Sequence, residues 1–318
     1  MTMKPWMRDF LWMAAGAAML LGVALVVFHF HKEQSPAQQL ARRVDRLERA
    51  SRIQLAMATA SEAEKSAVMA ITDEESQAFA DQARAATAQA DRERRELKEL
   101  LATDGTTDER KLLDQFSQAF ADFQRIDTDL LELAVKNTNL KASSLAFGPA
   151  AVAVKEMETA LDRLVATTAT SADTGEVARL ARTVQIGVLH IQMLFAPHIA
   201  EESNHKMDEL EGLMTKEEQK VRENLDALTK VQRLSDDPDL AAVVTSYAKF
   251  HGVKLRILAL SRENTNVRSL VISLMQKRKA ALLCSDVLVA LQQALQAEPV
   301  AGMTYRSPVN PRSFGAGH

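Results

Sequence analysis

Apolar residues recur along most of the chain at steps of three, four and seven, the spacing that places them on one face of an α-helix. One stripe consists of Phe116, Phe120, Phe123, Leu130 and Leu133. Another consists of Val243, Tyr247, Phe250, Ile257 and Leu260. Neither stretch alternates as a β-strand would. Helix breakers are scarce, with 11 glycines and 8 prolines in 318 residues, so the pattern predicts an all-α protein.

A segment near the N-terminus has a different pattern. Residues 10–30 read FLWMAAGAAMLLGVALVVFHF, in which His29 is the only ionisable residue. At about 1.5 Å per residue, a helix of this length crosses a hydrocarbon core of about 30 Å. We therefore expect a single transmembrane anchor here. A cleaved signal peptide is the alternative, with SPA at 35–37 as its cleavage site, although signal cores usually run only about 7–15 residues.

The flanking charges bear on the orientation of this anchor. Lys4 and Arg8 precede it, and the cations that follow it are Lys32, Arg42, Arg43, Arg46 and Arg49. The positive-inside rule therefore disfavours export of the C-terminal part, but long domains often cross the membrane regardless of charge. The apolar stretch 270–291 predicts a buried amphipathic helix and no second span, because Lys277 and its two neighbours would lie at mid-membrane.

The chain resembles itself at an offset of 127 residues. Residues 71–140 and 198–267 align without a gap and share 15 of 70 positions, about three times the number expected by chance. Phe123 falls on Phe250, and the triplet Asn-Thr-Asn at 137–139 falls on the same triplet at 264–266. We interpret the pattern as a duplication of one helical unit.

Helix-breaking sequences recur at matching places in the two copies. The segment ATDGTTDER supplies Gly105 as a helix stop and Thr106 with Glu109 as a capping box. The segment RLSDDPDL supplies Asp237 as a cap before Pro238. The apolar-poor segment TTATSADTGEV separates the copies.

A turn at each triplet divides every copy into four segments of about 28–35 residues, which can pack antiparallel along their full length. Gly148-Pro149 is a rival break in the first copy, but the matching Met275-Gln276 contains no helix breaker. We expect an N-terminal stub and anchor at 1–34, a four-helix bundle at 35–168, a linker at 169–175, a second four-helix bundle at 176–296 and a disordered tail at 297–318.

The triplets allow two interpretations. Asparagine caps helices and tolerates left-handed backbone geometry, so these residues would end one helix and start the next. Alternatively, their amides would bind a carboxylate or amide ligand beside a cation, because each amide donates and accepts hydrogen bonds. The candidate ligand-binding residues are Asn137, Asn139, Asn264, Asn266 and Arg268.

Composition and motifs exclude several functional classes. A net charge of −3 gives no electrostatic basis for binding nucleic acid. Cys284 is the only cysteine, so an internal disulfide and cysteine-based zinc or haem motifs are excluded. There is no glycine-rich phosphate loop, nucleophile elbow or HExxH motif. We therefore expect a protein that is not an enzyme and holds no cofactor.

Two further clusters have an ordinary and a functional interpretation. His198 and His205 lie seven residues apart, with Glu201 four residues before the second, and would be either exposed polar residues or part of a metal site. The segment DRERRELKE (91–99) is typical of a solvated helix face held by ion pairs between successive turns. Contact with anionic lipid or a partner protein is its functional alternative.

The segments LLELAVKNTNLKASSLAFGPA (130–150) and ILALSRENTNVRSLVISLMQKRKA (257–280), together with the anchor, resemble the four-helix-bundle sensor domain of bacterial methyl-accepting chemotaxis receptors. The resemblance covers residues 40–168 and again 176–296. It implies a domain outside the bacterial inner membrane that dimerises and responds to a small molecule or a binding protein. A complete receptor of this family also has a second span and a cytoplasmic helical hairpin, for which this sequence shows no counterpart.

These observations lead to two functional hypotheses. In the first, the chain is a single-pass membrane protein with a periplasmic, homodimeric sensory part, which passes a conformational signal to a partner protein. In the second, the bundles are a non-catalytic scaffold of the cell envelope that holds partner helices, in the manner of a coiled coil. A pocket with converging polar groups would favour the first, and a dry apolar core throughout would favour the second.

Overall fold

The computed structural model describes residues 36–170 and 173–297. This part of the chain is helical and contains no strand, as the sequence predicts. The elements are α2 (Pro36–Met69), α3 (Asp73–Asp104), α4 (Thr107–Ala134), α5 (Thr138–Leu145), η1 (Ala146–Ala150), α6 (Ala151–Thr167), α7 (Thr174–Met193), α8 (Phe195–Ala200), α9 (Asn204–Thr229), η2 (Gln232–Leu234), α10 (Pro238–Glu263), α11 (Thr265–Ile272), η3 (Ser273–Lys277) and α12 (Arg278–Ala297). The predicted anchor at 10–30 and residues 298–318 of the predicted tail lie outside the described residues.

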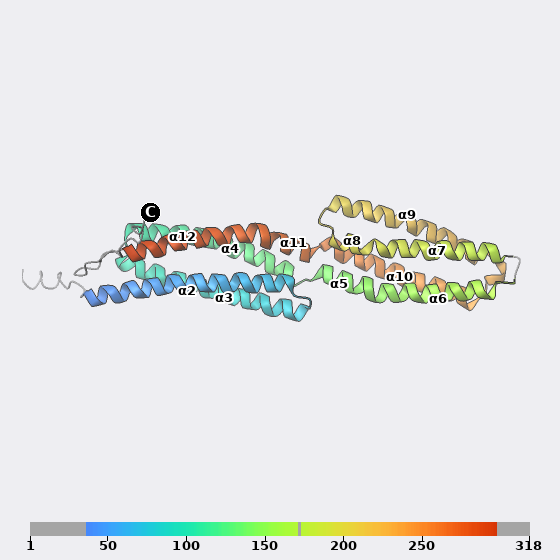
Figure 1. Ribbon diagram of the computed structural model, residues 1–318, viewed down its shortest axis with the longest axis horizontal. Coiled ribbons are helices and arrows are strands. Elements are labelled where there is room, and N and C mark those ends of the chain that lie inside the picture. Colours follow the sequence, from blue (N-terminus) through green and yellow to red (C-terminus); the bar gives the residue numbers. More distant parts are fainter. Residues whose placement is uncertain (1–35, 171–172, 298–318) are drawn as a thin grey trace, which may run out of the picture.

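The helices form two bundles stacked end to end, which gives an elongated molecule (Figure 1). Bundle A consists of α2, α3, α4 and α11–α12 (residues 36–134 and 265–297). Bundle B consists of α5–α6, α7–α8, α9 and α10 (residues 138–263). Neighbouring helices run antiparallel in each, and the start of α2 and the end of α12 lie together at the end of bundle A that faces away from bundle B (Figure 1).

The expected division into bundles of 35–168 and 176–296 is wrong for one helix of each copy. Helices α5 and α6 pack against α10, and α6 also contacts α7, whereas α12 packs against α2 and α4. Leu291 of α12 belongs to the same apolar core as Ile53 and Phe116. Bundle A therefore takes its fourth helix from the second half of the chain, and bundle B is inserted between α4 and α11.

The expected chain reversal at each triplet is the source of this error. Only residues 135–137 separate α4 from α5, and Asn264 alone separates α10 from α11. Both asparagines that precede the new helix adopt left-handed geometry, with φ of 51° at Asn137 and 54° at Asn264. These short kinks let the chain continue in the same general direction into the other bundle (Figure 1).

The apolar stripes found in the sequence face the cores. Phe116, Phe120 and Phe123 are buried in bundle A, where successive rings stack with centroids 5.5 and 5.8 Å apart. Phe250 is buried in bundle B, 5.9 Å from the ring of Phe195. Tyr247, expected to be a core residue like Phe120, is only half-buried against the core.

Several predicted helix ends are confirmed. Gly105 follows α3, and the Thr106–Glu109 capping box opens α4, with Glu109 N to Thr106 Oγ1 at 3.2 Å and Thr106 N to Glu109 Oε2 at 2.8 Å. Asp237 caps α10 directly before Pro238. These contacts satisfy backbone N–H groups that a helix start leaves without an intrahelical acceptor.

The helix that follows each triplet contains one π-helical turn. These turns are η1 (Ala146–Ala150), between α5 and α6, and η3 (Ser273–Lys277), between α11 and α12, and they are 127 residues apart. The first includes Pro149, which lacks the N–H needed for regular α-helical bonding, yet the helix passes through it. The predicted rival break at Gly148-Pro149 is therefore not a helix end.

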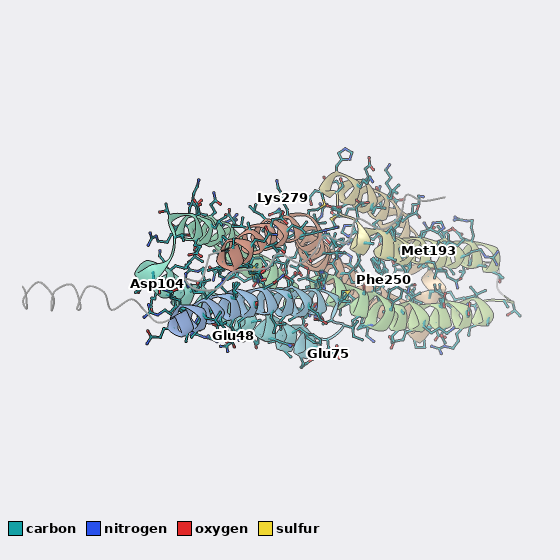
Figure 2. All side chains as sticks on the ribbon, turned by 60° about the vertical axis from the view of Figure 1, so that its left-hand side comes forward. Glu48, Glu75, Asp104, Met193, Phe250 and Lys279 are labelled. Atoms are coloured by element: carbon teal, nitrogen blue, oxygen red, sulfur yellow. The ribbon has the colours of Figure 1, made fainter. Side chains whose placement is uncertain are left out.

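Charged side chains cover the outside of both bundles, and Figure 2 labels Glu48 and Lys279 on bundle A. Within the segment 91–99, Asp91 pairs with Arg94 at 2.7 Å, which confirms the expected ion pairs along the helix. By length and composition, Thr174–Ala200 and Pro238–Ala297 are apolar enough to cross a membrane, a test that core helices of helical bundles also pass. Part of their apolar surface packs in the bundle cores.

Candidate functional site

The two Asn-Thr-Asn triplets lie against each other where the bundles meet. The backbone N–H of Thr138 donates to Thr265 Oγ1 at 3.2 Å, and that of Thr265 donates to Thr138 Oγ1 at 3.1 Å. The N–H of Asn139 donates to Asn266 Oδ1 and the N–H of Asn266 donates to Asn139 Oδ1, both at 3.1 Å. Each bond has a counterpart in which the two chain segments exchange roles, so the pairing has approximate two-fold symmetry.

The remaining amide groups of the triplets join the two segments further. Asn139 Nδ2 donates to Asn264 Oδ1 at 2.8 Å, and Asn266 Nδ2 donates to Asn137 Oδ1 at 3.0 Å. Asn137 and Asn264, which supply the acceptor oxygens, are 1% and 5% exposed. A buried polar group that loses its partner costs about 1–3 kcal/mol, which favours one fixed arrangement of the crossing.

The structure bears on both interpretations of the triplets, helix capping and ligand binding. The capping expectation needs correction: Asn137 and Asn264 precede new helices, but neither side chain bonds to the first turn of the helix that follows. Because their backbone is left-handed, the amides reach the other chain segment instead. The structure brings the four asparagines together, whereas Arg268 is exposed and no described residue forms an ion pair with it. A ligand at the triplets stays a prediction, and it would have to displace the existing bonds.

A second polar cluster lies beside the crossing in bundle B. The ring of His198 is fully buried, with Nδ1 2.8 Å from Ser261 Oγ and Nε2 2.9 Å from Glu211 Oε1. Arg262 also binds Glu211, at 2.7 Å. Burial lowers the pKa of His198, although the Glu211 carboxylate opposes this effect. The expectation of an exposed His198 is therefore wrong, whereas His205 is exposed as expected.

The order serine, histidine, glutamate has the connectivity of a nucleophile, a base and an acid. Ser261 and His198 are both 0% exposed, so a substrate has no access to them. A structural role at the end of bundle B explains this arrangement better than nucleophilic catalysis. No group of residues within the described ranges has the composition and spacing to hold a metal ion.

A third cluster lies in the interior of bundle A. The ammonium group of Lys277 in η3 pairs with the Asp127 carboxylate of α4 and lies 3.4 Å from the centroid of the Phe123 ring. Thr87 of α3 donates to the other oxygen of Asp127 at 3.1 Å. Lys277 and Asp127 are 2% and 3% exposed, so this is a buried ion pair supported by a hydrogen bond and a cation–π contact.

Glu64 of α2 completes this cluster. It is 1% exposed, and its Oε1 has no hydrogen-bond partner among the described residues. Burial raises the pKa of the Glu64 carboxyl, and the Asp127 carboxylate adds to the rise, whereas Ser273 and Lys277 oppose it. Burial lowers the pKa of Lys277, opposed by Asp127. A buried carboxyl group with one oxygen unpartnered, beside a buried lysine, distinguishes this place from an ordinary helical core.

The cluster borders a cavity of about 410 Å³ between α2 and η3–α12. Glu64, Ser273 and Lys277 form its inner wall, and the exposed Lys65 and Arg278 lie at its rim. The π-helical turn at η3 places Ser273 and Lys277, four residues apart, on the same inner face. Such single π-turns are frequent at functional sites.

Bundle B has a charged cluster of its own. Lys254 of α10 pairs with Glu218 of α9, which also accepts Arg222 at 2.7 Å and lies 2.7 Å from His251. The Glu218 carboxylate therefore has several partners, and these contacts hold its pKa below the ordinary value despite burial. This cluster joins α9 to α10.

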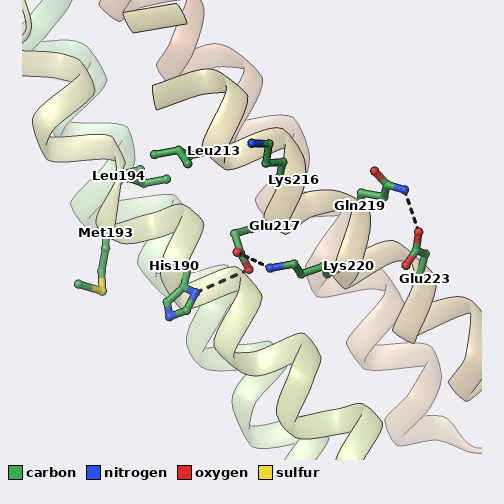
Figure 3. Close-up of a pocket in the computed structure, with 9 residues that line it drawn as sticks. All are labelled: His190, Met193, Leu194, Leu213, Lys216, Glu217, Gln219, Lys220 and Glu223. Atoms are coloured by element: carbon green, nitrogen blue, oxygen red, sulfur yellow. Dashed lines mark hydrogen bonds and ion pairs between the residues drawn. The ribbon is translucent and has the colours of Figure 1, made fainter. Parts of the chain in front are cut away.

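A groove of about 610 Å³ runs along the surface between α7 and α9 (Figure 3). Leu194 and Leu213 line its apolar part. Its polar groups are paired with one another: Glu217 lies 3.6 Å from His190 and 2.8 Å from Lys220. The groove is larger than the cavity in bundle A, but it offers no buried polar group that lacks a partner.

The sequence predicts a role for the triplets but none for the cluster in bundle A. In the sequence analysis, Lys277 only argues against a membrane span. A cation within an apolar helix that cannot be transmembrane requires a buried partner, and this was the available signal. Asp127 lies on the apolar face of α4, four residues after Phe123, and is the matching signal for a buried anionic partner.

Comparison with known proteins agrees with the fold. The model of one protein family, described as a four helix bundle sensory module for signal transduction, matches residues 45–176. This range begins in α2 and ends at the start of α7, so it includes the helix α5–α6 that packs in bundle B. No curated protein matches the chain significantly.

Proposed function

We propose that the chain is an extracytoplasmic sensory module of chemoreceptor type, anchored in the bacterial inner membrane by residues 10–30, with the bundles in the periplasm. The match to a sensory four-helix bundle family over residues 45–176 supports this class. In this proposal the module works as a homodimer and passes a conformational change to a partner protein.

One observation carries the proposal: the cavity in bundle A, where buried polar groups converge. A protein that only holds its helices together gains little from a buried ion pair, because an apolar replacement is often at least as stable. The buried Lys277, Asp127 and Glu64 are therefore better explained by ligand binding than by stability.

The lining of the cavity favours a small organic anion. Ser273 and Lys277 present hydrogen-bond donors, and Lys65 and Arg278 add positive charge at the rim. The only carboxyl group of the lining is Glu64, whose raised pKa favours the protonated form that also donates a hydrogen bond. A small carboxylate complements all of these groups.

Binding can be tested with the full chain in detergent, using acetate and succinate as probes and glycerol as a neutral control. We expect the anions to raise the melting temperature and to give heat in calorimetry. The double variant Lys65→Gln/Arg278→Gln should weaken binding at least about fivefold, since each rim cation contributes a surface-screened attraction. Arg125→Gln, an exposed arginine on α4, is the matched control.

Two results would overturn this assignment. Equal anion binding by wild type and the rim double variant would place the site elsewhere. Absence of binding by both probes would favour the alternative, a non-catalytic scaffold of the cell envelope that binds partner helices. Placement is tested separately: a reporter that works only in the cytoplasm, fused after His318, should be inactive if the bundles are exported.

A further inference from the structure

The backbone passes between the two bundles at only two places within the described residues, and both are short. Residues 135–137 join α4 to α5, and Asn264 joins α10 to α11. The bundles are therefore joined by two nearly continuous helix paths that run in opposite directions (Figure 1). Neither connection has the length to act as a flexible linker.

The paired triplets extend from this crossing to the inner turn of each bundle. In bundle B, Asn264 Nδ2 donates to the carbonyl of Glu201 at 2.8 Å, in the turn between α8 and α9. In bundle A, Asn137 Nδ2 donates to Asp73 Oδ1 at 3.0 Å, at the start of α3. Both asparagines are also bonded to the opposite triplet, so an unbroken series of hydrogen bonds runs from the α8–α9 turn to the α2–α3 turn.

Asn139 and Asn266 are the middle members of this series. Asn139 Nδ2 donates both to Asn264 Oδ1 and to the carbonyl of Ile199, at 2.6 Å. Asn266 Nδ2 donates to Asn137 Oδ1. Both side chains also accept a hydrogen bond from the backbone of the opposite triplet, so neither can move without breaking bonds to the other chain segment.

We propose that the paired Asn-Thr-Asn triplets are a coupling device that makes the two bundles respond as one unit. A bundle that rotated or slid against its neighbour would leave several buried or part-buried donors and acceptors without their partners. A change in bundle B is therefore transmitted to the start of α3 in bundle A. The inference does not depend on the proposed function, since it concerns the protein without any ligand.

Hydrogen exchange of the full chain tests this coupling. Val221→Ala removes two methyl groups from the core of bundle B, far from the crossing. In the wild-type background, we expect this change to speed exchange of amides at the start of α3, residues 76–80, by at least about threefold, because local opening is shared. In the background Asn139→Ala/Asn266→Ala, adding Val221→Ala should change the exchange rates of those amides by less than about 1.5-fold.

The matched control background is Thr128→Ala/Thr245→Ala, one exposed threonine on α4 and one on α10, each of which bonds only to its own helix. In this control background, Val221→Ala should still speed exchange at residues 76–80 by at least about threefold. If the double asparagine variant does not fold, Asn266→Ala alone gives the same comparison with a smaller reduction expected. Equal transmission in the triplet variants and in the control would overturn the proposal, as would absence of transmission in the wild-type background.

Discussion

Bundles A and B share a helical framework but differ at its centre. Five interior positions of bundle A are polar: Glu64, Thr87, Asp127, Ser273 and Lys277. The residues related to them by 127 positions are Ile191, Met214, Lys254, Ala146 and Ala150, and all five are buried in bundle B. The same arrangement of helices therefore carries a charged centre in one bundle and a mainly apolar centre in the other.

This difference separates the residues that specify the fold from those available for function. The phenylalanine and leucine stripes are present in both bundles, and a helical bundle needs little more than such stripes and helix ends. The central positions tolerate either chemistry. A centre that is polar in one of two similar bundles and mainly apolar in the other is consequently the better candidate for a specific role.

The shared framework predicts equal sensitivity to truncation in the two cores. Phe123→Ala and Phe250→Ala each remove a buried ring, which typically costs about 3–5 kcal/mol of unfolding free energy. Urea titration of both variants measures the loss. A cost below about 1 kcal/mol at both positions would show that the stripes do not form the cores.

The different centres predict unequal sensitivity to loss of a lysine. Lys277→Met leaves Asp127 buried without its cation, which should cost about 3–5 kcal/mol. Lys254→Met should cost only about 1–2 kcal/mol, because Glu218 keeps Arg222 and His251 as partners.

The double variant Lys277→Met/Asp127→Leu sharpens this test, since replacing both partners by apolar groups removes the unpaired charge. It should recover most of the stability lost in Lys277→Met. Equal losses from the two lysine substitutions, measured by urea titration, would mean that the centre of bundle A is no more dependent on its charges than that of bundle B.

The symmetrical crossing predicts similar effects in both bundles. Asn137 and Asn264 are left-handed, so alanine at either position adds a backbone cost of about 1–2 kcal/mol to the lost hydrogen bonds. Glycine loses the same bonds without that backbone cost. Each alanine variant should therefore be less stable than the matching glycine variant by about 1 kcal/mol in thermal and urea unfolding. Indistinguishable alanine and glycine variants would contradict the left-handed geometry.

Much of this architecture could be predicted from the sequence, because helices and their ends are determined by residues close together in the chain. The stripe around Phe123, the capping box at Thr106 and the cap at Asp237 each act within a few residues, and the structure confirms them. The triplets were also recognised as helix boundaries, since asparagine is suited to left-handed geometry.

Which helices pack together in one bundle could not be predicted in this way. The apolar faces of α6 and α12 are similar, so either helix can complete either bundle, and the sequence does not state which one does. The length of each break is known only from the structure. An antiparallel helix pair needs a loop of about 2–5 residues, and Asn264 is the only residue between α10 and α11. The buried position of His198 was equally hidden, because Ser261 and Glu211 are distant in sequence.

The bundles are also expected to differ in their response to acid. Burial lowers the pKa of His198 in bundle B, so the folded chain binds fewer protons there than the unfolded chain, whose histidine pKa is about 6.5. The stability contributed by neutral His198 is present above this pH and falls as the pH is lowered through it. Glu64 in bundle A has a raised pKa, so its contribution is full below the unfolded value of about 4.3 and is lost as the pH rises through the folded value.

Unfolding free energies of the wild type, His198→Asn and Glu64→Gln between pH 4 and pH 7.5 measure both contributions. We expect wild-type stability to increase with pH relative to His198→Asn and to decrease with pH relative to Glu64→Gln, by about 1.4 kcal/mol for each unit of pKa shift. His205→Asn and Glu62→Gln, both exposed, are the matched controls and should parallel the wild type. The two buried groups have opposite signs because burial favours the neutral form of each, which is the protonated form of glutamate and the deprotonated form of histidine. Slopes of the same sign for both variants would show that at least one of these side chains is hydrated in solution.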